Sequence, residues 1–159
     1  RFRILEGVDM IINAVINGEA VEKECNPNKR LVEFLRDDMG LVSVKEGCGE
    51  GECGSCTVLL DKEAVTSCTV LTGQINGREV TTVEGLDVMG ELKPVMESFV
   101  KAGAVQCGYC TPGMIISTIA LRYKNPNPME DEIKRALEGN LCRCTGYNKI
   151  IEAVKKIER

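Results

Sequence analysis

Residues 47–56 read GCGEGECGSC, a stretch of glycine and cysteine with no apolar periodicity, which predicts a loop. Its cysteines follow the spacing Cys-x4-Cys-x2-Cys, and one more cysteine comes after eleven further residues. A [2Fe–2S] cluster takes such a triplet from one loop and a fourth cysteine from elsewhere in the chain. Glycine lets the loop turn sharply and aim backbone N–H groups at sulfur. We therefore predict a [2Fe–2S] cluster here, with Cys68 supplied by an adjoining strand; its ligands are Cys48, Cys53, Cys56 and Cys68.

A second set of four cysteines lies further along the chain. It consists of Cys107-x2-Cys110 and Cys142-x-Cys144, with thirty-one residues between the two pairs. Each pair directly precedes a predicted helix start, so that two helix N-termini are expected to converge on one point. The free N–H groups and positive dipole ends would lower thiolate pKa values and stabilise an anionic cluster.

Zinc is the alternative for both sets. The x4 spacing of the first set differs from the paired Cys-x2-Cys knuckles that are usual in zinc sites, whereas the second set by itself also fits a zinc ribbon. A dithiol redox pair is a further alternative for the second set, and it is weaker because four cysteines are supplied. Spacing alone leaves the metal of the second set open.

The composition restricts the chemistry of the chain to thiolates. Its 159 residues include nine cysteines and no histidine. An odd number of cysteines, with no visible export signal, favours reduced thiols that act as ligands over a disulfide scaffold. The lack of histidine excludes mixed Cys/His zinc fingers, histidine-based catalytic zinc sites, Rieske ligation and Ser-His-Asp triads.

Charge and hydropathy argue against two classes of partner. Twenty basic and 24 acidic residues give a net charge of −4, which disfavours nucleic acid and anionic membranes. No apolar run approaches the roughly 18–20 residues of a membrane span. The first ten residues include Glu6 and Asp9 and do not read as a signal peptide, so we expect a cytoplasmic protein.

The N-terminal half of the chain mixes strands with one helix. Asn17-Gly18 separates two short apolar segments and predicts a hairpin over 10–24. Helical spacing of apolar residues predicts a helix over 30–39, ended by Gly40. Strands are expected over 57–60 and 64–71.

The apolar period changes to that of helices near residues 84–90, which we take as a domain boundary. Leu92, Val95, Met96, Phe99 and Val100 form one predicted helix face. Further helices are expected over 111–123, from 128 and over 150–157. Thr111 is expected to cap the first of these and Asn127 the second, each followed by proline at the first helical position. The fold class is therefore α+β, a small mixed domain followed by four helices.

Four blocks of sequence resemble a known family: VKEGCG at 44–49, GECGSCTV at 51–58, QCGYCTPGM at 106–114 and GNLCRCTGY at 139–147. They are similar to the iron–sulfur subunit of the molybdenum hydroxylases, the family of xanthine dehydrogenase, aldehyde oxidoreductase and carbon monoxide dehydrogenase. The resemblance runs from about residue 10 to the C-terminus. It implies a plant-type, β-grasp ferredoxin-like domain at 10–85 and an all-α four-helix bundle at 86–159, each with one [2Fe–2S] cluster. The ligands that it implies for the second cluster are Cys107, Cys110, Cys142 and Cys144.

The resemblance also implies a role inside a larger oxidoreductase, with no catalysis by this chain alone. Electrons would pass from a molybdenum centre through the helical-domain cluster and then the N-terminal cluster to FAD. A large subunit would hold molybdopterin, expected as the cytosine dinucleotide, and a medium subunit would hold FAD. Gln106 matches a family glutamine that hydrogen-bonds the pterin, and Cys144 matches the ligand whose sulfur approaches it. Loop 46–52 is the implied contact with the flavin subunit.

Two other functions stay open from the sequence: a free-standing two-cluster ferredoxin and a zinc-stabilised binding module. For the substrate of the complex we expect a purine or another N-heterocycle, with aldehydes, carbon monoxide and aromatic acyl-CoA compounds as alternatives. Residues 1–9 have no family counterpart. Cys25 matches no ligand position and is expected to be a structural or exposed thiol.

Overall fold

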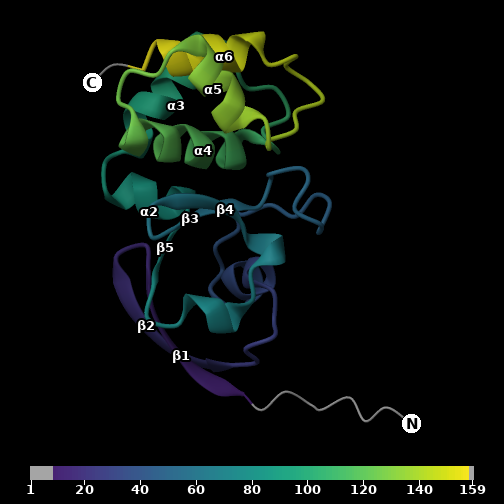
Figure 1. Ribbon diagram of the computed structural model, residues 1–159, viewed down its shortest axis with the longest axis vertical. Coiled ribbons are helices and arrows are strands. Elements are labelled where there is room, and N and C mark those ends of the chain that lie inside the picture. Colours follow the sequence, from purple (N-terminus) through teal and green to yellow (C-terminus); the bar gives the residue numbers. More distant parts are fainter. Residues whose placement is uncertain (1–8, 158–159) are drawn as a thin grey trace.

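The computed structural model describes residues 9–157, in which a mixed β-sheet lies beneath a layer of helices (Figure 1). The α+β fold class and the order of its parts, sheet first and helices second, are confirmed. The expectations for residues 1–8, and for the last two residues, lie outside the described residues. Within 9–157, no helix is both long enough and apolar enough to cross a bilayer.

Five strands form the sheet in the order β2-β1-β5-β3-β4. The first two are antiparallel and β5 runs parallel to β1, whereas β3 is antiparallel to both of its neighbours. The strands are β1 (Met10–Ile16), β2 (Glu19–Cys25), β3 (Thr57–Leu60), β4 (Glu63–Thr66) and β5 (Glu79–Thr81).

The predicted N-terminal hairpin is confirmed. Its turn residues Asn17 and Gly18 have φ angles of 54° and 84°, as a type I′ turn requires at both central positions. Along β1 the alternate residues Ile12, Ala14 and Ile16 are buried, as the period of two in a strand dictates. One face of the sheet therefore covers the N-terminal core.

The helix predicted over 30–39 is wrong in its form. A short α-helix, α1 (Leu31–Glu33), passes directly into a π-helix, η1 (Phe34–Asp38). The wider turn arises because the N–H of Met39 bonds to the carbonyl oxygen of Phe34 rather than to the next one along. Phe34 and Leu35 are fully buried against the sheet all the same.

The strand predicted over 64–71 is also wrong in its second half. Strand β4 ends at Thr66, and a 3-10 turn, η2 (Ser67–Thr69), follows it. The N–H and the hydroxyl of Ser67 both donate to the carbonyl oxygen of Cys56, which bends the chain there. Cys68 therefore lies in a turn and not in a strand. A second 3-10 turn, η3 (Thr72–Ile75), follows.

Five helices complete the described chain. A short helix at the boundary precedes four that pack around a core of large apolar side chains, including Phe99, Met114, Ile116 and Ile150. The helices are α2 (Val83–Val88), α3 (Leu92–Lys101), α4 (Thr111–Lys124), α5 (Glu130–Leu137) and α6 (Asn148–Lys155).

Two of the predicted helix caps are displaced. Thr111 is the first residue of α4, and Cys110 occupies the cap position predicted for Thr111. The cap of α5 is Met129 rather than Asn127, because the Glu132 carboxylate accepts the N–H of Met129 at 2.7 Å.

The predicted face of α3 is only partly buried. Leu92, Val95 and Phe99 lie in the helical core, but Met96 is 46% and Val100 is 68% exposed. The helix packs mainly against α6, and only a narrow apolar stripe of it meets the core.

Strand β3 joins the two parts, since both of its faces are buried. Val58 and Leu60 belong to the N-terminal core, whereas Leu59 points the other way and packs into the helical core. Helix α4 lies across this part of the sheet (Figure 1). As a result, the cysteine-bearing loops next to β3 and α4 are held close together.

Candidate iron–sulfur sites

The first cysteine set lies on the loop before β3 and on the turn after β4. Cys48 is exposed, Cys53 is half-buried, and Cys56 and Cys68 are buried. Backbone N–H groups point at two of the sulfurs: the nitrogen of Glu50 lies 3.4 Å from the Sγ of Cys48, and that of Gly51 lies 3.2 Å from the Sγ of Cys68.

Glycine makes this loop conformation possible. Gly49, Gly51 and Gly54 have φ angles of 74°, 83° and 67°. Other residues adopt this left-handed region only at a cost of about 1–2 kcal/mol each. The glycines thus let the loop curve around a point with its N–H groups directed inward.

The thiols of the first set influence one another in pairs. N–H groups of Glu50 and Cys53, together with the Cys53 thiol, lower the pKa of Cys48 to about 7. Burial, followed by the hydrogen bond and charge of the Cys56 thiol, raises the pKa of Cys68 to about 11. Cys48 is thus adjacent to Cys53, and Cys56 to Cys68, with Cys48 also close enough to raise the pKa of Cys68.

The second cysteine set forms two pairs as well. The sulfurs of Cys107 and Cys144 lie 3.7 Å apart, and their hydrogen bond raises the pKa of Cys144. Burial, followed by the Cys142 thiol, raises the pKa of Cys110 to about 12. Cysteines that are thirty-one or more residues apart in the sequence therefore meet in both pairs.

Cys142 is the thiol of this set with the most direct hydrogen-bond support. Burial opposes ionisation, but the Thr145 hydroxyl at 3.1 Å and the Thr145 N–H at 3.4 Å lower the pKa of Cys142 overall. The hydroxyl oxygen of Tyr147 accepts the N–H of Cys142 at 2.9 Å. The loop is thereby fixed on both sides of the sulfur.

The two helix starts predicted beside this set are only half confirmed. Cys110 is the cap residue of α4, so its thiol lies at the positive end of that helix. Helix α6 begins only at Asn148, after Tyr147 in a left-handed conformation, so Cys144 does not directly precede it. The three residues after Cys144 form a turn that presents N–H and hydroxyl groups to Cys142 instead.

The paired arrangement fits a [2Fe–2S] cluster. A [2Fe–2S] cluster needs four thiolates, two at each iron. Each site offers four thiols, with N–H groups aimed at some of the sulfurs, which is a donor set of that kind.

The two sites differ in how they meet the surface. Gln106, Cys107 and Cys144 are all exposed, and Leu141 beside them is 56% exposed. At the first site only Cys48 is exposed among the four thiols. Cys25, by contrast, is buried at the end of β2 against the N-terminal core, which agrees with a structural thiol.

One polar residue at the sites could not be identified from the sequence. Asn140 is buried between the two cysteine loops, with only 4% of the residue exposed. It directly precedes Leu141-Cys142 in one of the motif blocks, but nothing in the local pattern distinguishes it from a surface asparagine. Asn140 becomes buried only because the helical part packs against the N-terminal part.

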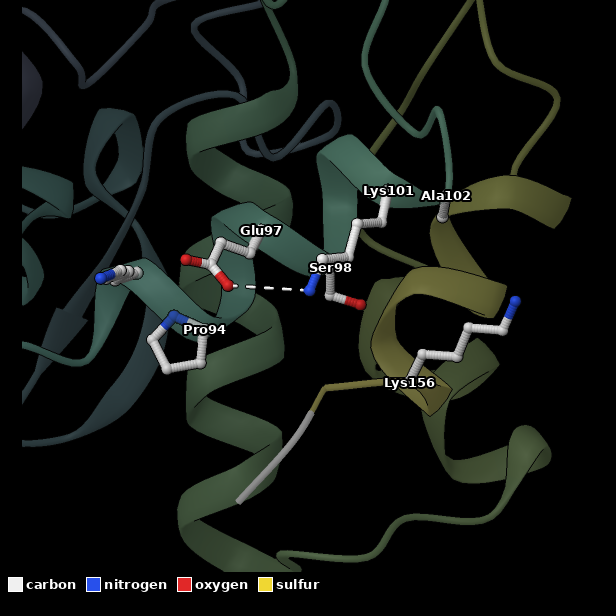
Figure 2. A pocket seen from close by; sticks show the side chains of 7 residues that line it. Pro94, Glu97, Ser98, Lys101, Ala102 and Lys156 are labelled. Atoms are coloured by element: carbon white, nitrogen blue, oxygen red, sulfur yellow. Dashed lines mark ion pairs between the residues drawn. The ribbon is translucent and has the colours of Figure 1, made fainter.

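A separate hollow of about 500 Å³ lies between α3 and the end of α6 (Figure 2). Figure 2 shows Glu97 and Lys101, one turn apart on α3, turned toward one another with 3.8 Å between their charged atoms. No cysteine lines this hollow, and its charged side chains are exposed. The residues that line it are Lys93, Pro94, Glu97, Ser98, Lys101, Ala102 and Lys156.

Together, these features define a two-part iron–sulfur protein. A model of the 2Fe-2S iron-sulfur cluster binding domain matches residues 14–82, and a model of a [2Fe-2S] binding domain matches residues 82–155. The chain belongs to the iron–sulfur subunits of the molybdenum hydroxylase family, which confirms the resemblance stated above.

Bacterial relatives support this assignment. The chain is 54% identical to the nicotinate dehydrogenase small FeS subunit of Eubacterium barkeri, over 91% of this chain and 92% of that one. It is 46% identical to the xanthine dehydrogenase iron-sulfur-binding subunit of Escherichia coli O157:H7, over 93% and 94% of the two chains. A chain in the crystal structure of quinoline 2-oxidoreductase from Pseudomonas putida 86 superposes with a TM-score of 0.88 at 41% identity, covering 93% of this chain and 91% of that one.

Proposed function

We propose that this chain carries electrons from a molybdenum centre to FAD, both held by partner subunits. When bound, each [2Fe–2S] cluster accepts and releases one electron. The observation that supports this best is the pair of four-thiol sites, each built from two adjacent thiol pairs. The small-subunit names of the relatives imply a complex of several subunits.

We assign the ligands of the two clusters to eight of the nine cysteines. The lowered pKa of Cys48 favours its thiolate form. The hydrogen bonds to the sulfurs of Cys68 and Cys142 reduce the free energy needed to deprotonate these thiols for metal binding. The N-terminal ligands are Cys48, Cys53, Cys56 and Cys68, and the helical-domain ligands are Cys107, Cys110, Cys142 and Cys144. The domains themselves are proposed as 10–85 and 86–159, a division that falls within α2.

The surface exposure of the two sites suggests which partner each one meets. Gln106 and Cys144 are exposed on the helical part, where a side-chain amide offers both a donor and an acceptor to a pterin edge. Loop 46–52 carries the exposed Cys48 and is proposed to face the flavin subunit. The molybdopterin, as its cytosine dinucleotide, and FAD would then lie at opposite ends of the electron path.

For the substrate we propose an N-heterocyclic aromatic compound, of which a purine is one example. The support is that relatives are named for nicotinate, xanthine and quinoline, which share a nitrogen-containing aromatic ring. This chain has no residues that we can assign to substrate binding. The reduced thiols of the sites are also in keeping with a cytoplasmic location.

The test is to purify the chain in its native state and measure its molecular mass and cofactors. Size-exclusion chromatography should show it in a complex that contains molybdenum and flavin, and N-heterocycles should bleach the visible absorption of the clusters. Elution as a single small chain with both clusters reducible would instead support the free-standing two-cluster ferredoxin.

A further inference from the structure

The two cysteine loops contact one another directly through the backbone. The N–H of Leu141 donates a hydrogen bond of 2.9 Å to the carbonyl oxygen of Cys53. Cys53 belongs to the first cysteine set, and Leu141 is the residue before Cys142 of the second set. A short path therefore joins the two sulfurs: the side chain and carbonyl of Cys53, this hydrogen bond, and the backbone from Leu141 to the side chain of Cys142.

Asn140 holds this contact in place from inside the interface. The residue is only 4% exposed, and its Nδ2 donates to the carbonyl oxygen of Gly54 at 3.0 Å. The hydroxyl of Ser117 on α4 donates to Asn140 Oδ1 at 2.7 Å, which fixes the side-chain amide with its NH2 group toward Gly54. The residues on either side of the bridge, Gly54 and Asn140, are thus tied to each other and to α4.

Glycine keeps side chains out of the gap between the loops. A Cβ atom built on Gly113 of α4 would lie 2.2 Å from the carbonyl oxygen of Gly54, far inside van der Waals contact. Gly139, next to Asn140, has no atom within 4 Å of such a Cβ. Both glycines lie close to the contact between Gly54 and Asn140, but only at Gly113 is there no room for a side chain.

We propose that Asn140 is a positioning residue that fixes the loop of Cys53 against that of Cys142 and so sets the electronic coupling between the two clusters. The inference rests on the proposed function. One electron leaves the helical-domain side, which is oxidised, and enters the N-terminal side, which is reduced, with no bond broken. Asn140 itself takes no part in the redox change; it keeps the Leu141–Cys53 hydrogen bond short.

The experiment compares Asn140→Ala and Gly113→Ala with the wild type in the intact, cluster-loaded complex. Gly139→Ala is the matched control, since it adds the same methyl group where there is room. The iron content of each protein is measured first. Two further quantities are then measured: the magnetic splitting of the paramagnetic signals when both clusters are reduced, and the rate of electron equilibration between the clusters. Hydrogen exchange of the Leu141 amide in the wild type gives a third measurement.

Asn140→Ala and Gly113→Ala should keep their iron, weaken the splitting and slow equilibration several-fold, because the electronic coupling falls steeply as the two loops move apart. Gly139→Ala should match the wild type, and the Leu141 amide should exchange slowly. Full iron with unchanged splitting and rate in Asn140→Ala would overturn the proposal. If both variants lost their iron, fast exchange of the wild-type Leu141 amide would overturn it and slow exchange would support it. A wild type with fewer than two clusters would instead contradict the proposed function.

Discussion

The N–H of Gly51 points at the sulfur of Cys68, with 3.2 Å between nitrogen and Sγ. The two residues are seventeen positions apart, on the loop before β3 and on the turn after β4. This contact ties the one thiol that is remote in the sequence to the loop that carries the other three. It distinguishes Cys68 from Cys25, which is also buried but lies at the end of β2.

Cys68→Ser should remove or damage the N-terminal cluster and leave the helical-domain cluster intact. The reason is that a hydroxyl at this position is a much weaker ligand for iron than a thiolate. Iron analysis together with the paramagnetic signals of the reduced protein measures the two clusters separately.

Cys25→Ser is the matched control, because it makes the same change at another buried cysteine. It should keep the full iron content and lower the free energy of unfolding by about 1–3 kcal/mol, since a hydroxyl replaces a buried thiol. Equal loss of iron from both variants would show that the fourth ligand has been assigned wrongly.

Alkylation of the cluster-free chain should depend on pH differently for each cysteine. The thiolate is the reactive form, and the pKa of Cys48 is lowered to about 7, whereas those of Cys68 and Cys110 are raised to about 11 and about 12. As the pH rises from about 6 to about 8, labelling of Cys48 by iodoacetamide should therefore increase steeply while the other two remain unlabelled. Mass spectrometry of the digested chain measures each site, and equal labelling of all three would contradict the loop geometry.

Gln106→Ala should keep both clusters but slow the reduction of the helical-domain cluster by substrate, or weaken retention of the molybdenum cofactor. Loss of one partner from a buried pterin edge leaves a desolvated polar group, at a cost of about 1–3 kcal/mol. The measurement is rapid mixing of the complex with substrate, following the two cluster signals separately.

Gln74→Ala provides the comparison, since Gln74 is the other glutamine and lies exposed in the N-terminal part. It should leave substrate reduction unchanged. Unaltered reduction in Gln106→Ala, with the cofactor fully retained, would remove Gln106 from the interface.

The sequence was sufficient for features that depend on short stretches of chain. The Cys48–Cys56 loop could be predicted because cysteine spacing and glycine content are both local, and the hairpin because Asn17-Gly18 favours one turn type. Helices α3 to α6 were located for the same reason, although α2 (Val83–Val88) was not predicted and some first residues were displaced by nearby hydrogen bonds such as that from Met129 to Glu132.

Features that depend on tertiary packing could not be predicted. The spacing of residues 30–39 is compatible with an α-helix, and only packing against the sheet produces the π-helix. The hydrogen bond from Leu141 to Cys53 joins residues from opposite halves of the chain, and the burial of Asn140 follows from that contact. The cysteine motifs indicated two sites, but not that their loops meet.

The measurement that tests the account most directly is the iron, sulfide and zinc content of the purified chain, with its visible spectrum. Two [2Fe–2S] clusters require about four iron and about four inorganic sulfide per chain, a red-brown colour when oxidised, and two distinct paramagnetic signals on reduction. We expect that result, with no zinc. About two iron per chain would contradict the second cluster, and a colourless protein containing zinc would contradict the electron-transfer function altogether.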